Sequence, residues 1–213
     1  AMGDPTVDQT LQWLPLLLNV QGRRCVVIGG GPVALRKARR LKEAGAYVVT
    51  IAPQRAEPEA WTSACDEYLH RSYGGPSDLE GAFLVIAATD EAQLNARIVR
   101  AARAASALTL RADAPETGHV DFPATLRRGP LTVSFATDGI SPAYAARLRR
   151  RAEGFYGDEH IRRLEVLKAH KRSLDPHRTP RTERAVLARR WAEEDPAFPC
   201  GSVALVGAGP GDP

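Results

Sequence analysis

Residues 25–34 read Cys25-Val26-Val27-Ile28-Gly29-Gly30-Gly31-Pro32-Val33-Ala34, an apolar, β-branched run that ends in three glycines. Such a run is typical of a buried parallel strand. Apolar residues then recur at helical spacing over 33–44, and Gly45 stands where a helix C-cap belongs. Residues 47–51, Tyr-Val-Val-Thr-Ile, indicate a second strand. The sequence therefore predicts a right-handed strand-helix-strand crossover.

Strand and helix patterns continue to alternate after this unit. Three strands are expected at 68–70, 82–88 and 108–112, and one helix is expected at 91–105. This alternation is typical of an α/β protein with a doubly wound parallel sheet of the Rossmann type. Asp113-Ala114-Pro115 stops the last strand, because proline constrains the residue before it. We place the end of a first domain, residues 1–113, at this point.

The pattern changes beyond residue 113. Two strands are expected at 122–126 and 131–136, around the turn Arg127-Arg128-Gly129-Pro130. Three helices follow, over 141–152, 158–173 and 181–194, the first opened by Ser141-Pro142. Residues 201–213 combine a strand with a glycine-rich loop, which indicates that the chain is the front portion of a longer protein. The expected fold class is thus α/β, with a Rossmann-type sheet followed by a small α+β region and a helical C-terminal part.

The composition is that of a globular protein. The chain has 213 residues, of which 44% are hydrophobic, enough for one large domain or two small ones. No run approaches the roughly 18 to 20 apolar residues of a membrane-spanning helix, and no signal peptide precedes the first strand, so a cytoplasmic protein is expected. Cys25, Cys65 and Cys200 lie far apart without a CxxC pair, which favours reduced thiols over disulfides or structural zinc.

The net charge of +4 is unevenly distributed. Residues 1–140 hold 15 basic and 15 acidic side chains, whereas residues 141–190 hold 14 basic and 6 acidic ones. The second segment therefore carries the whole basic excess. Such a segment suits a nucleic acid backbone, a membrane surface or a polycarboxylate metabolite, and a solvated helix surface would have the same composition.

The glycines fit the GxGxxG/A fingerprint of dinucleotide binding, with Ala34 in the third small position. This motif provides a tight turn, close approach to a pyrophosphate and a helix N-terminus that holds the anion. A purely structural turn is the alternative. The usual acidic residue for the ribose is absent from Ile51-Ala52-Pro53-Gln54. Gln54 or backbone groups are the alternatives for holding the ribose. Arg55 could bind the 2′-phosphate of NADP, so the motif does not decide between NAD and NADP.

Asp113 follows a predicted parallel strand at its carboxyl end, the edge where open α/β sheets place ligands. A carboxylate there can act as a general base, and an ordinary Asx turn is the equal alternative. Thr89-Asp90 ends the neighbouring strand with the same ambiguity. His119 and Asp121 lack a matching ligand set, so no metal site is expected. No serine or cysteine nucleophile pattern is present.

The sequence resembles the siroheme synthase family over most of its first 150 residues. The residues that carry the resemblance are Leu14-Pro15, Gly22, Cys25 to Gly31, Val33-Ala34, Arg36-Lys37-Ala38, Ala87-Ala88-Thr89-Asp90, Asn95, Asp113-Ala114-Pro115, Phe122-Pro123-Ala124, Gly139 and Ser141-Pro142. Residues 203–213 resemble the start of the uroporphyrinogen-III methyltransferase domain that follows this module in multifunctional members. The resemblance implies an NAD-dependent dehydrogenase that oxidises precorrin-2 to sirohydrochlorin, often with insertion of ferrous iron at the same site.

The resemblance also assigns roles to residues. It implies that Asp113 is the essential catalytic residue, taking a proton as hydride leaves for the nicotinamide. The expected cofactor-binding residues are Gly29, Gly30, Gly31, Pro32, Val33, Pro53, Gln54, Thr89 and Asp90. The expected residues for the carboxylate-edged macrocycle are Arg147, Arg149, Arg150, Thr137 and Ser141. Family members are homodimers, which assigns 114–150 to dimerisation, 151–199 to a helical domain and 200–213 to a truncated methyltransferase domain.

Some positions depart from the family pattern, and other functions stay open. Thr137, Asp138 and Leu110 differ from the residues common in relatives, which makes a dehydrogenase without chelatase activity one alternative. Another NAD-dependent dehydrogenase with an unrelated small substrate is a second. A third is a non-enzymatic NAD(H)-sensing module whose basic segment binds nucleic acid. Against the third, the sequence has no helix-turn-helix pattern or aromatic-interleaved basic stripe, so no nucleic acid partner is expected.

Overall fold

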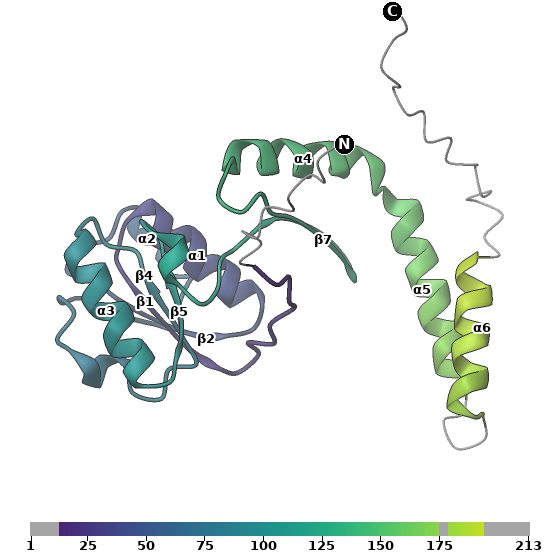
Figure 1. Cartoon of the computed structure of the whole chain (residues 1–213), viewed down its shortest axis with the longest axis horizontal. Coiled ribbons are helices and arrows are strands. Elements are labelled where there is room, and N and C mark those ends of the chain that lie inside the picture. The colour runs from purple at the N-terminus through teal and green to yellow at the C-terminus, as the bar shows by residue number, and fades with distance from the viewer. Residues whose placement is uncertain (1–12, 175–178, 194–213) are drawn as a thin grey trace, which may run out of the picture. The chain divides into compact units, whose positions relative to one another are not determined.

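The computed structural model describes residues 13–174 and 179–193 (Figure 1). The described residues fall into two compact units, one up to Pro123 together with 137–141 and the other formed by 124–136 together with the chain from Pro142 onward. Each unit is considered by itself. Cys200 and the predicted start of a methyltransferase domain at 200–213 lie outside the described residues.

A five-stranded parallel sheet forms the centre of the first unit. Its strands are β1 (Arg24–Ile28), β2 (Tyr47–Ile51), β3 (Glu67–Leu69), β4 (Leu84–Ala87) and β5 (Leu108–Arg111). They lie in the order β3-β2-β1-β4-β5, so the winding direction reverses between β1 and β4. Open α/β sheets bind their ligands beyond the carboxyl ends of the strands at such a reversal. The predicted Rossmann-type fold is confirmed.

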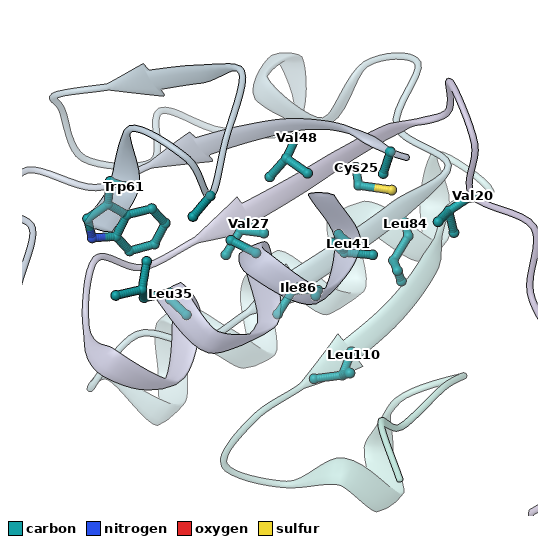
Figure 2. Close-up of a cluster of buried hydrophobic side chains, with 14 residues drawn as sticks. Val20, Cys25, Val27, Leu35, Leu41, Val48, Trp61, Leu84, Ile86 and Leu110 are labelled. Carbon is teal, nitrogen blue, oxygen red and sulfur yellow. The ribbon is translucent and has the colours of Figure 1, made fainter. Parts of the chain in front are cut away.

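Helices cover both faces of this sheet. They are α1 (Pro32–Glu43), α2 (Pro58–Trp61) and α3 (Ala92–Ala104), with the short 3-10 segments η1 (Pro76–Leu79) and η2 (Pro115–Thr117). Side chains of β1 alternate between the faces: Val27 packs in a cluster with Leu41 of α1, and Val26 in a cluster with Ile98 of α3. Figure 2 shows the cluster on the α1 face, which also contains the fully buried Trp61.

The second unit consists of a hairpin and three helices: β6 (Ala124–Arg128), β7 (Leu131–Phe135), α4 (Pro142–Phe155), α5 (Asp158–Ser173) and α6 (Arg181–Glu193). The strands pair antiparallel, and α4 packs on both of them. The helices α5 and α6 lie side by side (Figure 1). The Arg163 guanidinium donates to the Trp191 carbonyl, and the ring centroids of His170 and Trp191 are 4.8 Å apart.

The hairpin differs from its prediction in where the first strand starts and ends. That strand begins at Ala124 rather than at residue 122, because Pro123 has no N–H to donate to a ladder. Arg127 and Arg128, predicted in the turn, belong to the strand, which leaves a turn of only Gly129-Pro130 with Gly129 at φ +51°. The short helix α2 was not predicted, and α4 runs three residues past the predicted end at 152.

Candidate active site

The three glycines at the end of β1 occupy three different environments. Gly29 has φ +130°, and a Cβ there would lie 2.3 Å from the carbonyl oxygen of Ala88, just beyond β4. A Cβ on Gly30 would lie 1.8 Å from the carbonyl oxygen of Gln54. A Cβ on Gly31 would meet no atom within 4 Å. The chain's own backbone therefore requires the first two glycines, whereas the space above Gly31 is open.

The open space lies at the N-terminus of α1. Gly31 is the N-cap residue, and no side chain caps the helix. Pro32 occupies the first turn, which contains no acidic residue, and Ala34 is fully buried where helix and sheet meet. Uncapped N–H groups at a helix N-terminus bind anions, and a glycine without a Cβ lets a phosphate approach the backbone closely. The turn thus fits the pyrophosphate of a dinucleotide.

The loop after β2 is held against this turn. The Ala56 N–H donates to the Gly30 carbonyl at 2.8 Å, and the Tyr68 hydroxyl donates to the Gln54 carbonyl at 2.9 Å. The Arg55 guanidinium lies 5.3 Å from the centre of the Tyr68 ring. Pro53 and Gln54 are exposed beside the glycines. Gln54 and backbone groups of the loop can therefore hold an adenosine ribose, and the first carboxylate of the loop is Glu57, the N-cap residue of α2.

Asn95 joins the ends of β4 and β5. It is fully buried in the first turn of α3. Its side-chain oxygen accepts from the Thr89 N–H at 3.1 Å and the Thr89 hydroxyl at 2.7 Å. Its amide nitrogen donates to the Thr89 carbonyl at 3.0 Å and to Oδ1 of Asp113 at 2.8 Å. One amide side chain thus ties Thr89 to Asp113 at the carboxyl edge of the sheet.

Asp113 is also paired with Arg111, the last residue of β5. The Arg111 Nη2 lies 2.6 Å from Oδ2 of Asp113, and the two side chains are 16% and 32% exposed. The hydrogen bond from Arg111 holds the pKa of the Asp113 carboxyl below its ordinary value, against partial burial, and the bond from Asn95 adds to this. Asp113 is therefore an ionised acceptor that solvent or a ligand can reach.

Some of the predicted site residues lie together and others do not. Gly29, Thr89 and Asp113 are brought together, because Gly29 packs against the chain at Ala88 and Thr89 is bonded to Asp113 through Asn95. Asp90 is exposed between β4 and α3. Val33 is 40% exposed in the first turn of α1.

The residues predicted to bind the substrate belong to the chain after residue 136. Thr137 and Ser141 form a turn in which the Ser141 N–H donates to the Thr137 hydroxyl at 3.2 Å. Arg147, Arg149 and Arg150 are carried by α4 of the second unit, where Arg149 pairs with Glu153 one helical turn away.

Comparison with known proteins adds a family to this geometry. A family model described as putative NAD(P)-binding matches residues 16–124, which contain the glycine turn and Asp113. The chain belongs to this family. The siroheme synthase of Ectopseudomonas mendocina is 36% identical over 95% of the chain, and that of Azotobacter vinelandii is 37% identical over the same share. The chain spans about half, 49%, of the length of these relatives.

A solved structure shares the fold of this chain. The structure described as SirC, precorrin-2 dehydrogenase, matches with a TM-score of 0.66 and 21% identity, covering 85% of this chain and 90% of its own. The resemblance to siroheme synthases inferred from the sequence is confirmed by the relatives, and the fold by the structural match.

Two residues of the site were not predicted as functional. Asn95 carries the resemblance, yet no role was assigned to it. The available signal was the position of Asn95 itself: it is the one amide on the otherwise apolar face of α3 formed by Ile98, Val99 and Ala102. Arg111 lies two residues before Asp113, a spacing that places both on the same side of an extended chain. That spacing was the signal for their ion pair.

Proposed function

We propose that this chain catalyses the NAD-dependent oxidation of precorrin-2 to sirohydrochlorin. In this reaction the macrocycle loses two hydrogens, one as hydride to NAD⁺ and one as a proton, giving sirohydrochlorin, NADH and H⁺. The observation that carries the proposal is the Thr89-Asn95-Asp113 bridge, because it fixes an ionised carboxylate beside the glycine turn. The similarity to siroheme synthases supports the choice of substrate.

The residues around α1 fit the cofactor. We assign the pyrophosphate to Gly31 and the amides of the first turn of α1, and the ribose to Pro53 and Gln54. When bound, the nicotinamide supplies the hydride acceptor. Thr89 and Asp90 border this site at the end of β4, where Thr89 is fixed by its bonds to Asn95.

Asp113 accepts the proton in this proposal. Its carboxyl is ionised before substrate arrives, and two neighbours hold it in one orientation. About a third of its side chain is exposed, so a macrocycle can reach it. A positioned acceptor of this kind contributes roughly 10²–10⁴-fold to a rate.

Basic side chains are proposed to recognise the carboxylates on the edge of the macrocycle. Arg147 and Arg150 of α4 are exposed, and Arg149 is partly buried beside Glu153. Arginine suits this task because its planar fork binds carboxylates in pairs of hydrogen bonds. The Thr137 and Ser141 hydroxyls are proposed as neutral contacts to the same substrate.

The deciding experiment mixes the protein with precorrin-2 and NAD⁺ and follows the visible spectrum of the macrocycle together with NADH absorbance. The wild type should produce both changes, and Asp113→Ala should lose at least about 10²-fold in rate while still binding NAD. Glu43→Gln, an exposed carboxylate in the last turn of α1, is the matched control and should retain full activity. Absence of an NAD-dependent spectral change in the wild type would sink the assignment.

Insertion of ferrous iron is proposed as a second reaction of the same site. Among residues 13–174 and 179–193 no group of three or more His, Cys, Asp or Glu side chains is arranged to hold a metal ion. Iron is a substrate in this proposal, and the task of the protein is to receive pyrrole protons, for which the ionised Asp113 is suited. Ferrous iron added to enzyme and sirohydrochlorin should give the siroheme spectrum faster than without enzyme. If the enzyme does not accelerate iron insertion, the chain is a dehydrogenase without chelatase activity. If Asp113→Ala still accelerates it, the two reactions do not share Asp113.

The setting of the enzyme is part of the proposal. We assign residues 1–113 to cofactor binding, 114–150 to dimerisation within a homodimer, 151–199 to a helical domain, and 200–213 to the start of a covalently linked methyltransferase domain. Sedimentation at several concentrations tests the homodimer. A cytoplasmic location is proposed as well. No helix in the described parts of the chain has the length and apolar character to span a membrane.

A further inference from the structure

The guanidinium of Arg111 makes a hydrogen bond to the backbone of α3 in addition to its ion pair with Asp113. Its Nη2 donates to Oδ2 of Asp113 at 2.6 Å and to the carbonyl oxygen of Ala92, the first residue of α3, at 3.1 Å. Its Nε lies 3.1 Å from Oδ1 and 3.2 Å from Oδ2 of the same carboxylate. The side chain is only 16% exposed. The guanidinium is thus fixed between the end of β5 and the start of α3.

These contacts engage both oxygens of Asp113. Oδ1 accepts from the Asn95 amide at 2.8 Å and lies 3.1 Å from the Arg111 Nε. Oδ2 accepts from Nη2 at 2.6 Å and lies 3.2 Å from the same Nε. The fork of Arg111 and the amide of Asn95 therefore fix the orientation of the carboxylate together.

We propose that Arg111 is a positioning residue, which clamps Asp113 in the orientation in which its carboxylate receives the proton from the substrate and which sets the pH below which the reaction fails. The inference rests on the proposed function, since it takes Asp113 as the proton acceptor. It concerns a residue that never touches the substrate and acts only through the orientation and charge of Asp113.

The groups that face Asp113 make Arg111 the controlling charge. From β5 the guanidinium of Arg111 faces the carboxylate, and from α3 the neutral amide of Asn95 does. Glu116 of η2 acts electrostatically on Arg111. Removing the cation lets the pKa of Asp113 rise, because the largest cause of its lowering is the bond from Arg111. A carboxylate must be ionised to accept a proton, so activity would then be lost at a higher pH.

The test compares wild type with Arg111→Met, Arg111→Lys and the control Arg100→Met. Arg100 is an exposed arginine of α3. The rate of precorrin-2 oxidation is measured against pH. At the pH where the wild type retains half its maximal kcat, Arg111→Met should retain roughly a tenth of its own maximum, because an opposite charge nearby strongly favours ionisation. Arg111→Lys should fall between the two, since an ammonium keeps the charge but not the fork. Arg100→Met should follow the wild type, and KM should change little in all variants.

A second readout does not depend on activity. Protein labelled with ¹³C at aspartate carboxyls is titrated by NMR, and Asp113 is assigned by the signal missing in Asp113→Asn. Its midpoint should move to higher pH in Arg111→Met and less in Arg111→Lys. Circular dichroism confirms that each variant is folded, and Arg111→Gln replaces any that is not.

The outcomes separate this inference from the proposed function. A wild type that does not oxidise precorrin-2 overturns the proposed function, and with it the role of Arg111 in the reaction. An active wild type together with unchanged pH profiles and NMR midpoints in the Arg111 variants overturns only the clamp. A rate loss that is equal at every pH would also contradict it, because that result is expected of general structural damage.

Discussion

The side-chain amide of Asn95 lies 2.8 Å from Oδ1 of Asp113, although α3 carries one residue and the loop after β5 carries the other. The same amide also binds Thr89 at the end of β4. A single buried polar residue therefore fixes the relative positions of a proposed cofactor contact and the proposed proton acceptor.

Replacing Asn95 by alanine should affect stability and activity together. The partly buried Thr89 N–H and hydroxyl lose the Asn95 oxygen as their acceptor, which costs about 1 kcal/mol, the lower end of the penalty for a buried polar group. For a domain of this size each kcal/mol lowers Tm by about 2–4 °C. The rate of oxidation should fall further than stability explains, because Asp113 loses one of its two positioning partners. Calorimetry and kinetics on Asn95→Ala and on Gln93→Ala, an exposed amide in the same helical turn, provide the measurement.

A Tm of Asn95→Ala equal to that of Gln93→Ala would show that water replaces the lost hydrogen bonds. In that case the bridge would not contribute to folding, and a rate of oxidation equal to that of Gln93→Ala would also exclude a role in placing Asp113.

The glycines should respond differently to the same substitution. Gly30→Ala places a Cβ 1.8 Å from the Gln54 carbonyl oxygen, so the backbone must move, at a cost of roughly 1–3 kcal/mol or more. Gly31→Ala meets no atom and has φ −81°, which alanine adopts readily, so stability should change by less than about 0.5 kcal/mol. Its NAD affinity should nevertheless drop, because the methyl group occupies the space proposed for the pyrophosphate.

Urea unfolding and NAD titration of the two glycine variants give both quantities. If Gly31→Ala binds NAD as tightly as the wild type, the pyrophosphate does not approach α1 at this residue.

The sequence predicted the parts of this fold that depend on local patterns. The parallel strands and the helices α1, α3 and α5 follow from periodicity and from Gly45, which has the positive φ of a helix C-terminus. The two-residue hairpin turn did not follow from the sequence. Arg127 and Arg128 precede Gly129-Pro130 and were predicted in the turn with them, whereas their pairing with Thr132 and Leu131 places them in the strand. The contacts among Thr89, Asn95 and Arg111 depend on how β4, α3 and β5 pack, which local pattern does not specify.

The same reasoning explains the glycine motif. A fingerprint identifies three small residues but does not reveal which ones face a ligand and which face the chain itself. The close approach of Gln54 to Gly30 arises from the loop after β2, more than twenty residues away in sequence. Only the three-dimensional structure assigns the open space to Gly31.

Acid should weaken the first unit through Asp78. Arg71 binds this carboxylate and, as the largest cause, lowers its pKa, while Gly74 adds a backbone N–H at 2.7 Å. A carboxyl with a lowered pKa in the folded state stabilises the fold above its unfolded pKa of about 3.9. This stabilisation is lost as the pH falls through the folded-state value. Arg71 is 47% exposed, so solvent screening weakens the pair.

Asp78→Asn should therefore be less stable than wild type at pH 7, and the difference should shrink below about pH 4. Urea unfolding at a series of pH values measures it, with Glu59→Gln, an exposed carboxylate of α2, as the control. A difference that stays constant from pH 7 to pH 3 would assign the effect to packing rather than to charge.

Cys25 should be chemically inert in the folded protein. It is fully buried in β1, where desolvation raises the pKa of its thiol to about 11, against a smaller opposing effect of a backbone hydrogen bond at Leu84. At pH 8 only about one thiol in a thousand is then ionised, and the thiolate is the reactive form. Cys65 is partly exposed, so it should react with iodoacetamide faster than Cys25. Peptide mass spectrometry after labelling at pH 8, with and without urea, distinguishes the two sites. Labelling of Cys25 in the native protein at the rate seen in urea would mean that β1 opens to solvent, which is incompatible with a central strand that anchors the glycine turn.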